Sequence, residues 1–322
     1  MPSIDTLGQF SDNLVYSAIA VYALAMVGYA VEAAWRSRRR APDRIPALVG
    51  RTGSASPRVG PEDGAGDDVK GAAARVGRVA VSLTTLAVSL HLGAVLARGA
   101  AAGRAPWGNM YEFALTGALA AGVAYLLFLR RQPVRDLGAW IVGVILLTLG
   151  LSTTVLYTPA GDLVPALDSY WLVIHVIAAI VAGGVFTVGA FAGVLYLLRL
   201  REDRRSVAGS RGGYAAGLPS AAVLDRVAHI AHVFAFPIWT FAVIAGAIWA
   251  ENSWGRYWGW DPKETWAFIT WVLYAAYLHA QSTAGWRGRR ATWLLLAGYT
   301  AFVFNFFGVN MWITGLHSYA GI

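Results

Sequence analysis

The residues of this chain best suited to chemistry are its histidines and one dense cluster of tryptophans. The stretch "WGRYWGWDPKETW", residues 254–266, holds four of the 14 tryptophans. One histidine precedes it, His175 in "SYWLVIHV", and another follows it, His317 in "GLHSY". A flat aromatic face stacks on a planar ligand for about 0.5–1.5 kcal/mol beyond the area it buries, and a neutral imidazole binds metal ions. The pattern therefore predicts a site for a large planar ligand that contains a metal ion.

Haem is a ligand of this kind. Six-coordinate haem iron needs one axial ligand on each face of the ring, and two histidines flanking one aromatic loop can supply them. We therefore predict that His175 and His317 bind haem iron. The macrocycle is expected to lie against Trp254, Trp258 and Trp260. Trp254 and Trp258 are four residues apart, so they share a face if the loop coils into a short helix. The alternative is an interfacial aromatic belt, although a belt spreads its tryptophans over all helix ends.

The residues "DPKE" within the cluster also have a structural interpretation. Asp261 as N-cap, Pro262 at the first helical position and Glu264 three residues after the cap form the pattern of a capping box. Because capping explains both acids, no catalytic residue is assigned, but Asp261 is included among the residues expected to contact haem. Arg256 and Lys263 could meet carboxylates of the ligand.

The remaining histidines have weaker patterns. His279 in "YLHA" lies about 14 residues into a helix, hence roughly 20 Å from its outer end and in the inner half of a membrane. It is either a second haem ligand or a hydrogen-bonding group between helices. His229 and His232 share a helix face, but beyond Asp225 no acid is near enough in sequence to complete a metal site. A structural or interfacial role is expected for this pair, and a structural role for His91.

Composition indicates where these residues are held. The chain has 322 residues, of which 57% are hydrophobic and 14% charged, and its mean hydropathy is +0.51. A soluble domain carries nearer a quarter of charged residues. A bilayer core requires roughly 20 apolar residues per helix, and eight such runs lie near residues 14–34, 77–97, 111–129, 137–157, 171–198, 229–250, 265–285 and 291–313. We predict an all-α polytopic membrane bundle of about eight transmembrane helices. The chain has no cysteine, so it supplies no thiol of its own.

The basic residues set the expected topology. The segment before the first apolar run contains Asp5 and Asp12 but no Lys or Arg, unlike a signal peptide, and the run ends in "WRSRRR". Both termini are therefore expected on the outer side. The predicted inner segments, 35–78, 130–136, 199–228 and 286–290, hold 22 of the 26 Lys and Arg residues, as the positive-inside rule requires. The positive charge thus indicates topology, and no nucleic-acid partner is expected.

Three regions follow from this pattern. Residues 1–35 form an N-terminal transmembrane helix, and residues 36–76, rich in Pro, Gly, Ser and charge, form a disordered cytoplasmic linker. Residues 77–322 form a seven-helix domain with an outer tryptophan-rich loop at 249–264. Glu112 in "PWGNMYEF" lies near the outer end of a helix, where it could face a cavity or reach water.

The stretch "WGRYWGWDPKE", residues 254–264, resembles the W-G-x-x-W-x-W-D-x-K-E motif of haem-handling cytochrome c biogenesis proteins of the CcsA/ResC family, some of which are labelled CcsB. Every fixed position matches, and "SYWLVIH", "YLHA" and "GVNMWITGLHSYA" occur in the expected order around it. The resemblance covers roughly residues 77–322. It implies cytochrome c maturation in a bacterial plasma membrane, or a thylakoid-type membrane, with the active face extracytoplasmic.

The resemblance also implies partners and roles. His175 and His317 match the outer axial ligands of haem, and His279 matches the ligand of a transmembrane haem site whose second ligand comes from a ResB-like subunit. Ferrous haem b is the substrate, and two thiols of a Cys-x-x-Cys-His segment in apocytochrome c add across its vinyl groups. A thioredoxin-like protein keeps those thiols reduced. Whether this chain catalyses thioether formation, as part of a holocytochrome c synthase, or only presents haem is left open.

Three other readings of the sequence compete with this one. A CcmC- or CcmF-like haem chaperone shares the aromatic motif, but the lysine–glutamate ending and eight helices favour CcsA/ResC. A solute transporter would need polar groups along a midplane path, and the apolar runs offer few besides His279. A scaffold for another membrane protein, like an ordinary transporter, would bind no haem.

Overall fold

The computed structural model describes residues 4–39, 63–161, 169–207 and 213–317. None of these residues lies in a β-strand. The helices are α1 (Ile4–Arg39), α2 (Asp63–Ala102), α3 (Met110–Arg131), α4 (Gly138–Thr154), α5 (Tyr170–Val207), α6 (Ala221–Trp254), α7 (Pro262–Ser282), α8 (Arg289–Val303) and α9 (Val309–Trp312). Short turns η1 (Arg135–Leu137) and η3 (Tyr214–Gly217) are 3-10 helical, and η4 (Phe304–Gly308) is a π-helical turn between α8 and α9.

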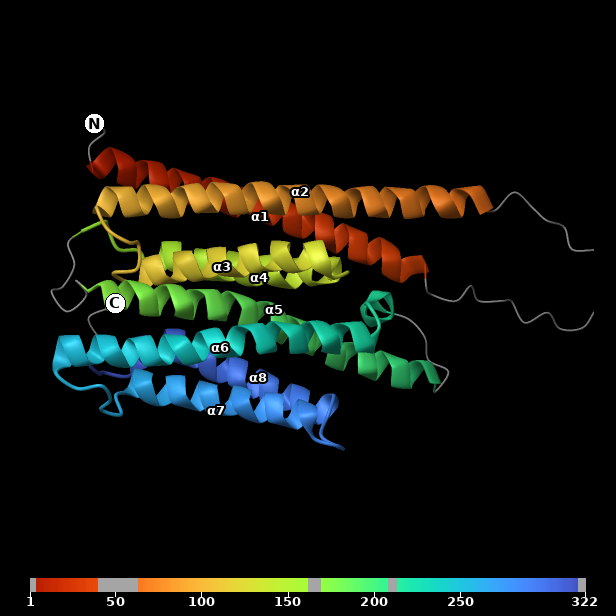
Figure 1. Ribbon diagram of the computed structural model, residues 1–322. Helices are drawn as coiled ribbons and strands as arrows, with labels where there is room; N and C mark the ends of the chain where they lie inside the picture. The colour runs from red at the N-terminus through yellow and green to blue at the C-terminus, as the bar shows by residue number, and fades with distance from the viewer. Residues whose placement is uncertain (1–3, 40–62, 162–168, 208–212, 318–322) are drawn as a thin grey trace, which may run out of the picture.

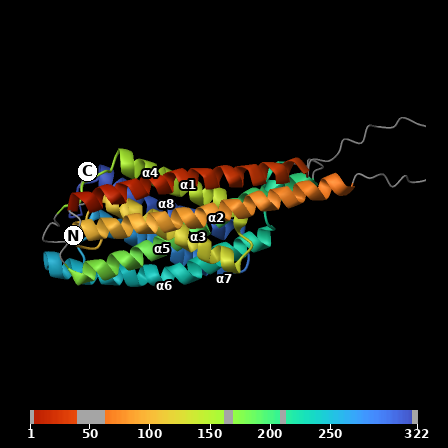
Figure 2. The same cartoon turned by 90° about the horizontal axis from the view of Figure 1, so that it is seen from above.

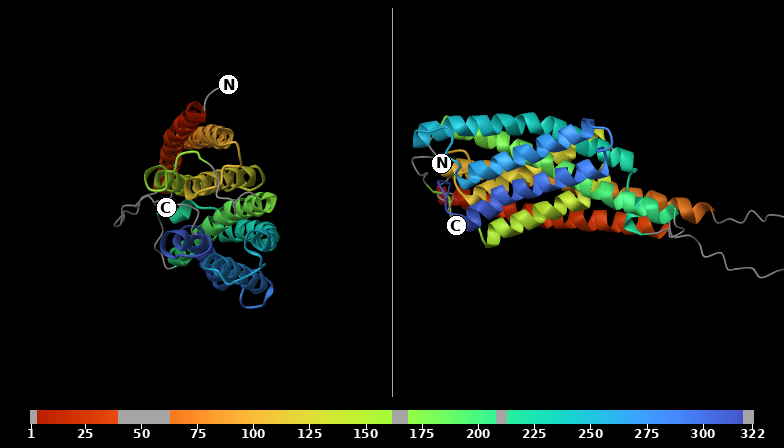
Figure 3. Two further views of the ribbon diagram at one scale, coloured as in Figure 1. Left: turned by 90° about the vertical axis from the view of Figure 1, so that its left-hand side faces the viewer. Right: turned by 90° about the horizontal axis from the view of Figure 1, so that it is seen from below.

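The helices are arranged as four antiparallel pairs in chain order, α1–α2, α3–α4, α5–α6 and α7–α8, which all run along one axis (Figures 1 and 2). Seen end-on, the pairs stack from α1 and α2 on one side to α7 and α8 on the other (Figure 3). The first helix of each pair begins at the same end of the bundle, where α6 ends and α7 begins (Figure 1). We call this the aromatic end. The connections that follow α2, α4 and α6 therefore meet there.

Seven helical segments are long and apolar enough to cross a membrane: α1 to α6, and the continuous segment from α8 to α9. The eighth, α7, has 21 residues, enough to span a bilayer, but begins with the charged residues Lys263 and Glu264. The prediction of an all-α polytopic bundle of about eight membrane helices is confirmed, with α7 as its least apolar member. That the termini lie on the outer side of the membrane stays a prediction.

Small residues allow the helices to pack closely. At Gly184 in α5, an added Cβ would lie 2.6 Å from the backbone carbonyl carbon of Ala120 in α3. At Gly28 in α1, it would lie 2.9 Å from the Cβ of Ala80 in α2. Such approaches are typical of membrane helix pairs, which associate through backbone proximity more than through the hydrophobic effect. The approach at Gly184 brings α3 and α5 together, and the one at Gly28 brings α1 and α2 together.

The segment between α6 and α7 is shorter than the predicted loop at 249–264. Helix α6 continues to Trp254 and ends at Gly255, which adopts a left-handed conformation with φ of 68° that favours glycine. Helix α7 then starts with the predicted capping box, because the side chain of Asp261 accepts from the Lys263 N–H and that of Glu264 accepts from the Asp261 N–H. Trp254 and Trp258 therefore lie on different elements and do not share a helix face.

The N-terminal region also differs from the expected boundaries. Helix α1 extends to Arg39, and α2 begins at Asp63, inside the predicted linker; residues 40–62 of that linker lie outside the described residues. Helix α1 packs along α2 and α4 and is not a separate helix. Tyr29 of α1 hydrogen-bonds Thr84 of α2 at 3.1 Å, and Tyr125 of α3 donates to Tyr29 at 3.2 Å. Buried polar contacts thus join α1 to the bundle.

Candidate functional site

A cavity of about 470 Å³ lies among α3 to α8 and η4 and reaches the aromatic end; we call it the central cavity. Its volume is in the range of ligand sites. The wall is mostly apolar, from Phe191 in α5 up to Trp258 in the α6–α7 connection. Both predicted outer ligands line it, although 142 residues separate them in the sequence (317 minus 175). The fold therefore brings His175 and His317 to one cavity, as expected.

His175 lies near the start of α5, and its ring is fixed by a hydrogen bond across to α6. Its Nδ1 is 2.7 Å from the carbonyl oxygen of Ala242. A carbonyl only accepts, so Nδ1 carries the proton and Nε2 keeps the lone pair that can bind a metal. Gly246, one turn further along α6, provides the space, because a Cβ there would lie 2.8 Å from the Cε1 of His175.

His317 is oriented by Asp261. Its Nδ1 lies 2.8 Å from Oδ2 of Asp261, and Oδ1 of the same carboxylate accepts from the N–H of Leu316 at 2.7 Å. Burial lowers the pKa of His317, and the hydrogen bond to Asp261 offsets this only in part. Burial raises the pKa of Asp261, but the hydrogen bonds from His317 and Leu316 outweigh it and leave the pKa lowered. The stable pair is a neutral imidazole that donates to a carboxylate, with Nε2 as the metal-binding nitrogen.

Two tryptophans contact the imidazoles. The indole of Trp249 is parallel to the ring of His175, with an interplanar angle of 8° and centroids 6.4 Å apart, and its centroid is 5.7 Å from that of His317. The ring centroid of Trp254 lies 5.0 Å from that of His317 and 4.8 Å from that of Trp249. Trp249 was not predicted as a site residue, because it precedes the motif that begins at Trp254. In the sequence, Trp249 follows Gly246 by three residues, a spacing that places both on the same face of a helix.

The other tryptophans of the motif divide between the cavity and the surface. Trp258 lines the central cavity. Trp260 was expected beside it but does not line the cavity: it is 65% exposed, has a positive φ of 58°, and packs edge-on against Phe268 of α7. The turn into the capping box directs its side chain outward. The structure therefore places Trp254 and Trp258, but not Trp260, where a ligand in this cavity would touch them.

Of the histidines outside the cavity, His279 is exposed, whereas His232 and His91 are buried. His279 is exposed in the last turn of α7 and does not line the central cavity. His232 is buried, with Nδ1 2.8 Å from the carbonyl of Ala228 and its ring stacked on Phe186. His91 is buried with Nδ1 3.5 Å from the hydroxyl of Tyr22. Within the described residues no group of three or more His, Cys, Asp or Glu could hold a metal ion. These contacts agree with structural roles for His91 and His232.

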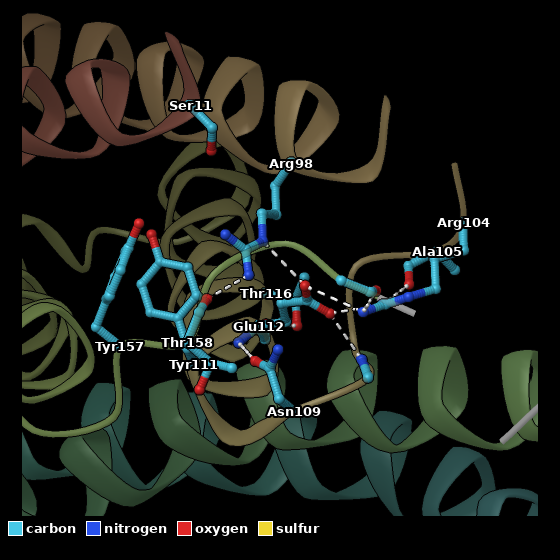
Figure 4. A network of polar contacts seen from close by, with 12 residues as sticks. Ser11, Arg98, Arg104, Ala105, Asn109, Tyr111, Glu112, Thr116, Tyr157 and Thr158 are labelled. Carbon is cyan, nitrogen blue, oxygen red and sulfur yellow. Dashed lines mark hydrogen bonds and ion pairs between the residues drawn. The ribbon is translucent and has the colours of Figure 1, made fainter. Parts of the chain in front are cut away.

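Glu112 faces neither the cavity nor water, so both expectations for it were wrong. It is fully buried at the start of α3 and ion-paired with Arg98 at 2.9 Å and Arg104 at 2.7 Å (Figure 4). The N–H of Gly108 also donates to it at 2.7 Å, and Arg98 donates to the carbonyl of Thr158. Sequence could not reveal this network, because it joins α2 and the connections after α2 and α4.

Fold and site together define a polytopic helical membrane protein with two oriented histidines and a set of tryptophans at one end of an apolar cavity. The family described as "Cytochrome C assembly protein" matches residues 107–317, and the chain belongs to this family. Its role is cytochrome c maturation with haem handling, as the resemblance of its motif implied.

Two relatives illustrate the similarity of this chain to cytochrome c biogenesis proteins. The chain is 32% identical over 261 residues to the cytochrome c biogenesis protein CcsA of Guillardia theta, covering 76% of this chain and 85% of that protein. It is 33% identical over 288 residues to the CcsA of Synechococcus elongatus, covering 76% and 87%. Among solved structures, "Cytochrome c Heme Lyase CcmF" matches 95% of this chain but only 47% of its own, with a TM-score of 0.59 at 18% identity. That likeness shows a shared fold.

Proposed function

We propose that this protein holds haem at the aromatic end between His175 and His317 and presents it for attachment to apocytochrome c. The observation that carries the proposal is that both histidines line one apolar cavity, and each has its Nδ1 engaged by an acceptor from a different element. Two fixed rings with Nε2 lone pairs are the ligand set of a bis-imidazole haem. Haem is the substrate here, released with the product cytochrome.

The chemistry proposed is addition of two cysteine thiols to the two vinyl groups of ferrous haem b. In each addition the sulfur bonds to one vinyl carbon and the thiol proton goes to the other, so no electrons are exchanged. The protein's own contribution is position: the imidazoles hold the iron, and Trp249, Trp254 and Trp258 offer an apolar surface for the macrocycle. The substrate's histidine can then displace one of the two outer ligands.

The outward face of α7 is proposed as the contact surface for a ResB-like partner. Phe268, Val272 and His279 are all exposed, and their spacing places them on one stripe of the helix. Helix α7 lies at the edge of the bundle, beside α6 and α8 (Figure 3). An ionisable side chain facing outward at membrane depth is costly unless it has a partner. A ligand from that partner, opposite His279, would complete a second haem site within the membrane. A thioredoxin-like protein is proposed to keep the cysteines of apocytochrome c reduced.

We place the aromatic end on the extracytoplasmic side of a bacterial plasma membrane, or on the equivalent side of a thylakoid-type membrane. The distribution of charge supports this orientation. Of the 26 Lys and Arg residues, only Arg98, Arg104, Arg256 and Lys263 lie outside the four predicted inner segments. Haem is made in the cytoplasm and cytochromes c mature outside it, so a site at this end is where substrate and product meet.

The test is an absorption spectrum of the detergent-purified chain co-expressed with its ResB-like partner. The native protein should show a low-spin bis-imidazole spectrum. His175→Ala and His317→Ala should each disrupt it, and added imidazole should restore it by filling the vacated position. The matched control is His91→Ala, which removes a buried histidine that does not line the central cavity, and it should leave the spectrum intact. Colourless native protein, as expected of a transporter or a scaffold, or haem indifferent to both substitutions, would overturn the assignment.

A further inference from the structure

The four basic residues at the aromatic end have different surroundings. Arg98 and Arg104 are both ion-paired with Glu112 and do not line the central cavity. Arg256 is exposed, and its guanidinium lies over the backbone of the connection, where a Cβ at Gly259 would overlap it. Lys263 alone of the four lines the central cavity.

Lys263 makes no ion pair with a carboxylate among the described residues, although the charge of Asp261 acts on it from farther away. Its ammonium lies over the ring of Phe306, 6.0 Å from the centroid. The two nearest acids in sequence are held elsewhere: Asp261 by His317 and Leu316, and Oε2 of Glu264 by the N–H groups of Gly259 and Asp261.

Glu264 lines the same cavity and its Oε1 is buried without a hydrogen-bond partner, but among the described residues it makes no ion pair with Lys263. A half-buried cation in an apolar wall that is not paired directly with an anion is energetically costly until one arrives.

Lys263 lines the same cavity as His317, the proposed iron ligand. Haem carries its two carboxylates on one edge of the macrocycle and its vinyl groups away from that edge. A cation in the cavity wall therefore attracts the carboxylate edge of a ring bound in that cavity.

We propose that Lys263 binds a propionate carboxylate of the haem and thereby fixes the rotation of the macrocycle about the iron–histidine axis. The ligands alone leave that rotation free, because imidazole coordination has no preference among the edges of the ring. With the carboxylate edge fixed at Lys263, the vinyl groups point toward the side of the cavity away from Lys263. Lys263 is a positioning residue in this scheme, which rests on the proposed function.

The test compares haemin with haemin dimethyl ester, in which both carboxylates are neutral. Each is titrated into the full chain, co-purified with its ResB-like partner, stripped of haem and held in detergent. The native protein should bind haemin about tenfold more tightly, the factor that corresponds to about 1.4 kcal/mol. Lys263→Met should bind both porphyrins equally, and Lys263→Arg should keep the preference. Arg256→Met, the matched control for a neighbouring cation, should also keep it.

The outcomes separate the two proposals. Native protein that binds both porphyrins with equal affinity, or a Lys263→Met variant that keeps the preference, would overturn the role of Lys263 and leave the histidine site intact. Native protein that binds neither would overturn the proposed function itself. The ester comparison uses the unaltered chain, so a folding defect in a variant does not remove the test.

Discussion

Asp261 holds His317 at 2.8 Å across 56 residues of sequence while it also caps α7. One carboxylate therefore fixes both the start of a helix and the ring of a proposed haem ligand. Oδ1 accepts from the Leu316 N–H, and Oδ2 accepts from the Lys263 N–H and the His317 ring. Replacing it tests whether these two roles can be separated.

Asp261→Asn should keep the cap, because asparagine is as good an N-cap as aspartate. It should weaken haem binding through His317, since loss of a residue that orients a metal ligand costs about 10–100-fold in affinity. Haem titration together with a thermal unfolding curve checks this. Haem affinity equal to that of the native protein would show that the carboxylate acts only as a cap.

Lowering the pH should release haem from the proposed site. The pKa of His317 is lowered from its ordinary value of about 6.5 by burial, so the imidazole remains neutral below that pH. A group whose pKa is lower in the folded protein than in the unfolded chain stabilises the folded site at pH values above its unfolded-state pKa. This stabilisation is lost as the pH falls through its folded-state pKa. The lowered pKa of Asp261 acts in the same sense at more acidic pH. The spectrum should therefore be constant above about 6.5 and change only below it. A transition centred above that value would contradict the burial of His317.

Gly246→Ala should impair haem binding without removing a ligand. The added Cβ would lie 2.8 Å from Cε1 of His175, so the imidazole must move. Overpacking of this kind costs about 1–3 kcal/mol, and we expect the affinity for haem to fall roughly tenfold or more. Gly150→Ala in α4 is the matched control, because a Cβ there meets nothing within 4 Å. Equal haem affinities for the two variants would show that the ring of His175 is not confined.

Glu112→Gln should destabilise the fold more than the site. It leaves Arg98, which is 1% exposed, and Arg104 without their carboxylate. Breaking a buried ion pair costs about 3–5 kcal/mol. Asp203→Asn removes the partner of Arg199 in a half-exposed pair and should cost no more than about 1 kcal/mol. Detergent-phase thermal unfolding of both variants measures the difference, and similar unfolding temperatures would argue against a structural role for the network.

Long apolar runs made the helices predictable, but their ends were not. The predicted runs reflect the thickness of a bilayer, whereas α2 and α6 continue beyond it through polar residues that form helix equally well in water. The residues Trp249 and Trp254 were assigned to a loop for that reason. Boundaries of this kind depend on backbone capping at single positions such as Gly255.

The sequence pointed to the two histidines that line the central cavity, but not to the residues that orient their rings. His175 and His317 were found because histidines are rare in apolar sequence and flank an unusual motif. The hydrogen bonds from His175 to Ala242 and from His317 to Asp261 join residues 67 and 56 positions apart, which local patterns cannot reveal. For Asp261, a complete local explanation as a cap concealed its second role.

The pairing of helices in chain order has a consequence for biosynthesis. Each antiparallel pair crosses the bilayer and returns, so successive pairs can enter the membrane as the ribosome completes them, with contacts that are mostly local in sequence. Helix α7 is the one helix of the four pairs outside the segments apolar enough to cross a membrane by composition, and it packs beside α6 and α8. The walls that α7 and α8 give the central cavity are added after those from α3 to α6. Because His317 lines the central cavity, the cavity is complete only after residue 317 has been synthesised.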